Sequence, residues 1–280
     1  YSTYRGKGKY VGELDLSNRG FKGKGRLDYL GAVINAEDFV FQPDKVVGSA
    51  KNFSLEEEIK PLEIPKVVGK EVTVTWKPYQ DSLYLASGSQ SFSVFKSGSY
   101  LFDGNLILTP DGVGGSGLLN WPLASLKADK IKFGANTARS DTAWLKIKGK
   151  TEEEVLLEAL NVKAGINFDN GLGVFTGNDE KLLTNLPFNQ YTTSLIDFDW
   201  NIKDQMVYFK SDTASVGVFA SKVANQDSLR FNGKNARYNL KDFSLGIGGV
   251  DFIHAADAKI FPDKGMVTIR SNGLIDSFAN

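Results

Sequence analysis

The sequence contains no cysteine and only one histidine, His254. Without cysteine, the chain can form no disulfide, no thiolate metal site and no cysteine nucleophile. One histidine cannot supply a cluster of histidine metal ligands, and in this sequence no triad or acid–base pair forms around it. We therefore expect a structural role for His254, and we expect no metal and no cofactor.

The chain also lacks a net charge, because 33 basic residues balance 33 acidic ones. A protein without a net field has little attraction for nucleic acid or for an anionic membrane surface, so we expect no nucleic-acid partner. No apolar run approaches the roughly 18 residues that span a bilayer. The sequence begins at Tyr1 without methionine and ends within an apparent strand pattern, which favours an excised piece of a longer protein.

Apolar residues alternate with polar ones along most of the chain, and 41% of the residues are hydrophobic. In the segment 71–76, for example, Val72, Val74 and Trp76 share one face of a predicted strand. Turn signals separate such runs, as in Thr109-Pro-Asp-Gly112 and Asp169-Asn-Gly171. Short strands every 10 to 12 residues or so predict a sandwich, a barrel or a solenoid.

One segment fits two interpretations. Thr151 and Glu154 have the spacing of a capping box ahead of good helix formers up to Leu160, which is typical of a short helix. An acidic loop followed by a strand fits the same residues.

An internal repeat is the most informative feature of the sequence. At an offset of 92 residues, positions 12–41 align with positions 104–133 without a gap, and ten of the thirty pairs are identical. Chance would give about two identities at ordinary residue frequencies. Glycines and alternate apolar residues repeat in this stretch, whereas no charged or nucleophilic residue does, so we interpret the glycines as turns and the repeat as structural.

The repeat predicts the fold class and the domain organisation. We expect an all-β, elongated repeat of short strands, which could be a solenoid, a β-taco or a stacked flattened sandwich. Two units of about 92 residues would occupy 8–99 and 100–190, with a divergent β continuation over 191–280. Four leucines on the repeated strand should be interior: Leu14, Leu16, Leu106 and Leu108.

Several segments resemble very long, uncharacterised envelope proteins of Bacteroidetes-type bacteria. They are residues 20–30, 39–45, 228–238, 249–258 and 259–270. The recurring pattern of apolar residues, Ala-Asp and Gly-Val turns is also similar, at the level of fold, to the periplasmic lipopolysaccharide-transport bridge family, whose β-taco carries acyl chains in an apolar groove. The resemblance implies a location in the periplasm or at the cell surface of a Gram-negative bacterium. It implies as partners other segments of a longer chain or envelope proteins, with lipid or glycan as further candidates.

Three residues are candidates for a contact surface. Asp197 and Asp199 share one face of a predicted strand, and two such carboxylates could serve a glycosidase, although alternation alone also predicts a solvated face. Trp144 is out of phase with its aliphatic neighbours, so we expect it to be exposed as a binding platform or as an ordinary surface residue.

The remaining charged patterns favour structural interpretations without a bound ligand. The acidic runs 56–58 and 152–154 lack the spaced ligands of a calcium loop and are interpreted as solubilising loops. Gly6-Lys7-Gly8 and Gly23-Lys24-Gly25 lack the spacing of a phosphate-binding loop and are interpreted as turns.

These observations favour a non-catalytic structural or interaction module of a larger cell-envelope protein. Two alternatives remain open, namely an amphipathic lipid conduit or scaffold and a carbohydrate-active β-helix enzyme.

Overall fold

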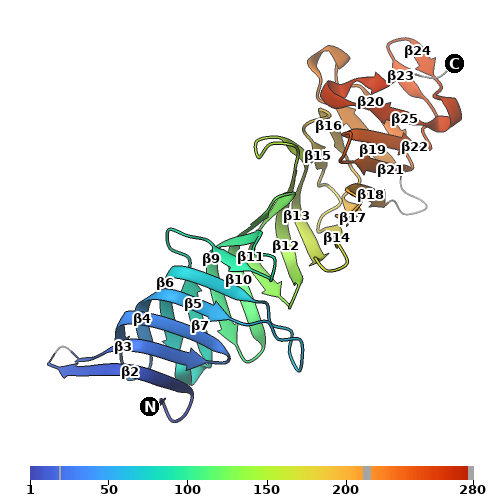
Figure 1. Ribbon diagram of the computed structural model, residues 1–280. Helices are drawn as coiled ribbons and strands as arrows, with labels where there is room; N and C mark the ends of the chain where they lie inside the picture. Colours follow the sequence, from blue (N-terminus) through green and yellow to red (C-terminus); the bar gives the residue numbers. More distant parts are fainter. Residues whose placement is uncertain (19, 211–215, 277–280) are drawn as a thin grey trace. The chain divides into compact units, whose positions relative to one another are not determined.

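A computed structural model describes residues 1–18, 20–210 and 216–276, and it shows an all-β protein, as the alternation predicts (Figure 1). The chain divides into two compact units. The first contains Tyr1–Pro122 and Lys127–Ala138, and the second contains Leu123–Leu126 and Arg139–Asn280. In the described ranges no helical segment is long and apolar enough to span a membrane.

The strands up to the end of the first unit are β1 (Ser2–Thr3), β2 (Gly8–Ser17), β3 (Gly20–Tyr29), β4 (Ala32–Phe41), β5 (Val46–Leu55), β6 (Val67–Lys77), β7 (Ser82–Ala86), β8 (Phe92–Val94), β9 (Tyr100–Thr109), β10 (Gly112–Trp121) and β11 (Ala124–Phe133). The later strands are β12 (Thr137–Lys148), β13 (Val155–Asn167), β14 (Leu172–Gly177), β15 (Thr184–Leu186), β16 (Tyr191–Thr193), β17 (Asp197–Asn201), β18 (Met206–Lys210), β19 (Gly217–Ser221), β20 (Arg230–Gly233), β21 (Asn235–Asn239), β22 (Ser244–Gly248), β23 (Ile253–Ala255), β24 (Ala258–Ile260), β25 (Val267–Ile269) and β26 (Ile275–Asp276). 3₁₀ turns lie at Pro78–Gln80, Ala224–Gln226, Asp263–Gly265 and Ser271–Gly273.

The first unit is a series of antiparallel strands in chain order. β2, β3, β4, β5 and β6 pair consecutively, and β9 pairs with β10. Between β6 and β9 lie two short strands, β7 and β8, and each pairs with both long neighbours. One edge of each long strand is therefore covered by two short strands, which follow one another along its length.

The second unit applies the same principle over most of its length. β13 pairs with both β14 and β15, and from there the chain alternates between two antiparallel ladders. One ladder runs β14–β17–β18–β21–β22–β25–β26, and the other runs β15–β16–β19–β20–β23–β24. Consecutive hairpins therefore belong to opposite ladders. After one hairpin has been added to one ladder, the next hairpin along the chain is added to the other.

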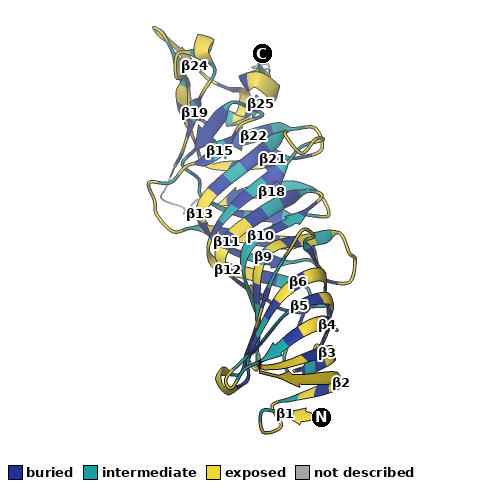
Figure 2. Ribbon diagram, turned by 90° about the vertical axis from the view of Figure 1, so that its left-hand side faces the viewer, coloured by how far each residue is buried: buried dark blue, intermediate teal, exposed yellow. Residues whose placement is uncertain are grey.

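Alternating burial shows where the core of each unit lies (Figure 2). In β17 every second residue is buried, and in β6 the same alternation holds on either side of Lys70 and Glu71, as period-two side-chain geometry requires. Trp76 in the first unit and Trp200 in the second are completely buried, as predicted from their phase. Buried side chains therefore line one face of each strand, and the opposite face carries most of the charged residues.

The repeat is visible in the strand boundaries. The bounds of β2, β3 and β4 coincide with those of β9, β10 and β11 when 92 residues are added to each. The repeated strands are ten residues long. The division into 8–99, 100–190 and 191–280 is a division of the sequence, and it stays a prediction.

A pair of facing glycines lies in the middle of each repeated hairpin. Gly12 lies opposite Gly25 in β2 and β3, and Gly104 lies opposite Gly117 in β9 and β10. A Cβ atom on Gly104 would lie 2.2 Å from the carbonyl oxygen of Ser116, so the two backbones approach too closely for a side chain. The interpretation of Gly25 and Gly117 as turns was wrong, because they lie within β3 and β10 and allow close contact in the middle of a continuous hairpin, whereas Gly112 does follow a turn.

An aromatic pair covers the next repeated glycine on the inner face. Tyr10 and Phe41 meet edge to face at 5.1 Å above Gly23, and Phe102 and Phe133 meet in the same way at 5.4 Å above Gly115. A side chain at either glycine would collide with these rings. The prediction of a turn at Gly23-Lys24-Gly25 is therefore wrong, since all three residues lie within β3. Gly6 and Lys7 do lie in a turn ahead of β2.

Two of the four leucines predicted to be interior are exposed. Leu106 and Leu108 are buried in β9, but Leu14 and Leu16 lie at the surface of β2. β7 pairs with the edge of β9 beside Leu106 and Leu108. Within the described residues, the equivalent edge of β2 is paired only at its beginning, by β1. The sequence pattern is the same in both copies, and the missing neighbour makes the difference.

The ambiguous segment 151–160 forms a turn and a strand rather than a helix. The side chain of Glu154 accepts a hydrogen bond from the backbone N–H of Lys150 at 2.7 Å, and β13 begins at Val155. Apolar residues from Leu156 onward enter the core of the strand layer, which provides more burial than one isolated helical turn could. The predicted strand pattern at the C-terminus extends to Asp276 in β26, and residues 277–280 lie outside the described residues.

Candidate functional site

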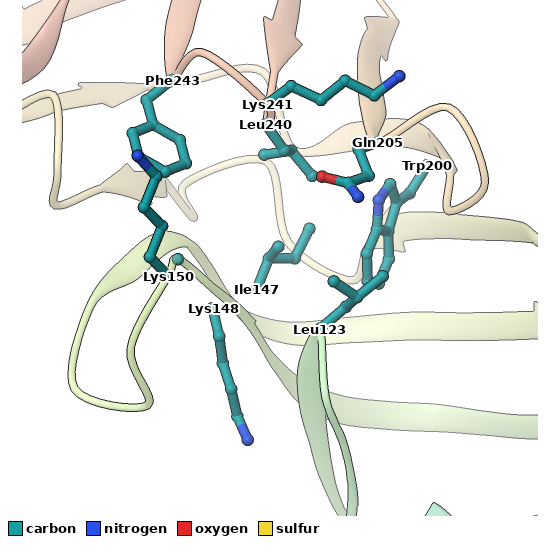
Figure 3. A pocket seen from close by; sticks show the side chains of 10 residues that line it. Leu123, Ile147, Lys148, Lys150, Trp200, Gln205, Leu240, Lys241 and Phe243 are labelled. Atoms are coloured by element: carbon teal, nitrogen blue, oxygen red, sulfur yellow. The ribbon is translucent and has the colours of Figure 1, made fainter. Parts of the chain in front are cut away.

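A pocket of about 300 Å³ with a largely apolar lining lies in the second unit (Figure 3). Its lining residues come from segments that are distant in sequence: Leu123, Ile147, Lys148, Gly149, Lys150, Trp200, Gln205, Leu240, Lys241 and Phe243. They lie in the turn between β10 and β11, at the end of β12 and just after it, on β17, at the β17–β18 turn and in the loop between β21 and β22. The ladder that contains β17, β18, β21 and β22 therefore forms the wall together with the end of β12 and the turn between β10 and β11.

Backbone hydrogen bonds fix these segments in place. The N–H of Lys148 donates to the carbonyl of Leu123 at 2.9 Å, and the N–H of Leu240 donates to that of Gln205 at the same distance. Gln205 has a φ of 56°, as the tight turn between β17 and β18 requires. The floor of the pocket is therefore built from turns that are held to their neighbours, rather than from one continuous strand.

The polar groups of the pocket are mainly lysines. The ammonium of Lys150 lies 5.3 Å from the centre of the Phe243 ring, and that of Lys148 lies 3.7 Å from a carboxylate oxygen of Glu152. In Figure 3 the Lys241 chain extends away from Leu240 and the Lys148 chain points away from the other labelled side chains. The site thus combines an apolar wall with cationic groups near its rim.

Acidic groups also lie near this pocket. Burial raises the pKa of Tyr238 above its usual range, and the negative charges of Glu154 and Asp242 raise it further. Asp242 accepts hydrogen bonds from the N–H and hydroxyl of Ser244 and lies 3.9 Å from Arg270. Tyr238 therefore stays neutral at ordinary pH, and the local carboxylates are occupied in structural contacts.

The predicted carboxylate pair lies on β17, and each member has its own structural partner. Asp197 accepts a hydrogen bond from the backbone N–H of Gly177 at 2.9 Å, and Asp199 forms an ion pair with Lys210 at 2.6 Å. Both side chains are on the half-buried outer face of the strand, as the alternation predicts. Each carboxylate is thus used in joining neighbouring segments.

Trp144 is half-buried on the outer face of β12, out of phase with the core as predicted. Its indole N–H donates to Glu158 at 3.1 Å, and the ammonium of Lys146 lies 4.3 Å from its ring. Lys146 and Glu158 also form an ion pair at 3.6 Å. The ring is one member of a three-residue surface cluster, and its exposed part remains available for contact.

The remaining chemistry-bearing residues are dispersed. His254 on β23 is exposed and its ring contacts Phe252. Glu57 forms an ion pair with Lys96 and accepts a hydrogen bond from Asn136. Over residues 1–18, 20–210 and 216–276, no group of three or more histidine or acidic side chains could hold a metal ion.

Sequence reasoning did not find the pocket, because its walls come from turns that meet only after the ladders form. One signal was available in the alternation of Lys146, Lys148 and Lys150, which marks the end of β12 as basic. The apolar partners Leu240 and Phe243 lie ninety or more residues further along and carried no such signal. No family model, curated protein or solved structure matches this chain.

Proposed function

We propose that the protein is a non-catalytic structural and interaction module of a larger β-repeat protein of the cell envelope. One observation carries the proposal: the residues that the two copies share are glycines and apolar residues, and no charged or nucleophilic residue is shared. The facing glycines and the covering aromatic pair recur at equivalent positions. Repeats that share only backbone devices and core positions serve stacking, and function then resides in their surfaces.

The state of the candidate catalytic groups supports the same proposal. General acid–base catalysis needs two groups that converge on a substrate in a cleft. Asp197 and Asp199 instead bind a backbone N–H and a lysine. The expected partners are further segments of a longer chain or other envelope proteins, which would meet surfaces such as the Trp144 cluster.

Enzyme assays on a broad glycan panel test the proposal against the alternative of a carbohydrate-active enzyme. The purified protein and the double variant Asp197→Asn, Asp199→Asn are compared, and the unfolding midpoint of each is measured. We expect no turnover by either protein. Turnover that disappears in the variant at an unchanged unfolding midpoint would refute the proposal.

The pocket in the second unit supports a second candidate function, the binding of a small anionic amphiphile. Its volume of about 300 Å³ is at the lower end of ligand sites, its wall is apolar, and Lys150 and Lys241 provide positive charge. A short acyl chain with a phosphate or carboxylate end matches that combination. This would make the protein a lipid-binding scaffold.

Native mass spectrometry of the freshly purified protein and titration with dodecyl phosphate test this second candidate. Binding is followed by the change in tryptophan fluorescence, to which Trp200 in the wall contributes, and is compared with the variant Lys241→Glu. The matched control is Lys259→Glu, a charge reversal elsewhere in the second unit. Equal binding by all three proteins, or no binding at all, would remove the amphiphile from consideration.

A further inference from the structure

The outer edge of β9 shows how the repeated hairpin is completed. β7 pairs antiparallel with β9, which brings Leu83 opposite Leu108 and Leu85 opposite Leu106. All four leucines are buried. At the near end of β9, β8 pairs with Tyr100, Leu101 and Phe102. The hairpin of β9 and β10 therefore has two short strands along its outer edge.

Among the residues that the structure describes, the equivalent edge of β2 has only one of these two strands. β1 pairs with Gly8 and Lys9, where β8 would stand. In the part of the chain that the structure describes, no strand pairs with the outer edge of β2 over residues 11–16, which correspond to residues 103–108 of β9. The position that β7 occupies in the second copy is open in the first.

Matched positions show what the missing strand does to the inner face. Leu16 is 76% exposed while its counterpart Leu108 is 1% exposed, and Leu14 is 36% exposed while Leu106 is 2% exposed. On β3, Phe21 is 37% exposed, whereas its counterpart Val113 is 3% exposed. Three large apolar residues at one end of the first unit are thus left in water only where a β7-like neighbour is missing.

We infer that the outer edge of β2 is a docking site for one added antiparallel strand with the chemistry of β7, an extended segment with leucines at alternate positions. The inference stands on the two copies of the repeat and does not depend on the proposed function. The occupant places its two leucines opposite Leu16 and Leu14 and completes the hairpin as β7 completes that of β9. Its backbone pairs with residues 13–16 of β2.

The edge favours a polypeptide strand over the other occupants. A lipid chain could cover Leu14 and Leu16, but it offers no groups to pair with the backbone edge of a strand. A second copy that paired β2 with β2 about Leu14 would set Glu13 opposite Asp15, and like charges directly opposite each other are destabilising. The β7 register instead sets Tyr84 opposite the position of Asp15 and Ala86 opposite that of Glu13.

A graft of the chain's own strand tests the inference. Residues 82–92 are joined ahead of Tyr1, so that Leu85 stands at the same distance in sequence from β2 as it does from β9. The matched control carries the same graft with Leu83→Ser and Leu85→Ser in the grafted copy only. Hydrogen exchange of the amides of residues 13–16 and the thermal midpoint are measured for the parent and both grafts.

We expect the leucine graft to slow exchange at residues 13–16 by about tenfold or more and to raise the thermal midpoint, and we expect the serine graft to do neither. Leu16→Asp should leave the parent unchanged, because this side chain is already in water, and should abolish the gain in the grafted protein. If the graft impairs folding, the free peptide of residues 82–92 added to the unaltered protein provides the same exchange readout.

Three results would overturn the inference. Equal protection by the leucine and serine grafts would mean that the leucines are not recognised. Protection of residues 13–16 in the ungrafted protein that grows with its concentration would assign the edge to a second copy. Protection by phospholipid vesicles or copurifying lipid, without any by the graft or the peptide, would assign it to lipid.

Discussion

At the scale of single residues, glycine determines where the strands of this protein can approach one another. Gly104 and Gly117 face each other in β9 and β10, as Gly12 and Gly25 do in β2 and β3. A missing side chain in mid-strand usually weakens a sheet, because glycine loses more backbone entropy than other residues. The repeated pair is therefore a position where close approach outweighs that cost.

Gly104→Ala should lower the free energy of unfolding by about 1–3 kcal/mol, because the added methyl group would overlap the Ser116 carbonyl. Gly165→Ala in β13 is the control, since a Cβ atom there meets nothing within 4 Å. Denaturant unfolding measures both. The control should be neutral or stabilising by up to about 1 kcal/mol, and equal losses in the two variants would contradict the close-approach argument.

The two copies of the repeated leucine also separate residue type from environment. Leu108→Ala should cost about 2–5 kcal/mol, because it removes a buried side chain and leaves a cavity. Leu16→Ala, at the equivalent but exposed position, should change the free energy of unfolding by no more than about 0.5 kcal/mol. Similar losses measured by chemical denaturation would show that β2 is covered in solution.

Tyr29 makes the free energy of unfolding depend on pH in the alkaline range. Burial, together with the nearby charge of Asp81, raises the pKa of Tyr29 to about 12, against 10.0 for an exposed tyrosine. The folded state holds the phenol proton more tightly, so this contribution is fully present below pH 10 and is lost as the pH rises towards 12. Unfolding followed between pH 9 and pH 12 should show a shallower decline for Tyr29→Phe than for the unaltered protein, and parallel declines would contradict the assignment.

At the scale of elements, the long strands define the architecture and the short strands fill it. β6, β9 and β13 each pair with two shorter strands along one edge, so a ten- to thirteen-residue strand holds two ladders together. The hydrophobic pattern indicated strands throughout, but it contained no information on which short strand joins which ladder. The pattern specifies the buried face of a strand, and only pairing specifies its neighbour.

Equivalent strands should be exchangeable between copies. Replacing β4 with the sequence of β11 keeps Ala32, Ala36 and Phe41 and alters the inward residues Ile34 and Phe39. Two hydrophobic changes of this kind should together cost no more than about 3 kcal/mol, and the chimera should unfold cooperatively.

The control chimera inserts the same sequence shifted by one residue. A one-residue shift turns every inward side chain outward, so this protein should not reach the native state. Circular dichroism and denaturant unfolding compare the two. If both chimeras were equally stable, the repeat would not determine the packing of β4.

At the scale of the whole molecule, 33 basic residues balance 33 acidic ones, so the charged side chains act mainly through short-range contacts at the surface. Most charged side chains with described partners join neighbouring strands or turns, as Lys210 and Asp199 do. Such exposed pairs add little to stability, and they leave no long-range field to attract a polyanion.

We therefore expect no binding of duplex or single-stranded DNA tighter than about 100 μM, the weak end of nonspecific affinity at physiological salt. Fluorescence anisotropy of labelled oligonucleotides at low and physiological salt measures this. A rise in anisotropy at low salt that disappears at high salt would reveal a basic surface that the balanced total conceals.

The sequence alone determined the fold class, the strand phases and the repeat, because each depends on local alternation or on the identity of residues at a fixed offset. Burial of Trp76 and Trp200, the outward position of Trp144 and the shared face of Asp197 and Asp199 all follow from that periodicity. These properties need only the geometry of one strand.

Tertiary structure alone decided which faces are covered and which segments meet. Leu16 and Leu108 occupy the same place in the same motif, yet one is in water and the other is in the core, because only β9 has β7 beside it. Likewise Phe243 reaches Lys150 only after the ladders have brought their turns together. A pattern along the chain specifies what a residue can bury, and the neighbouring strand decides whether it does.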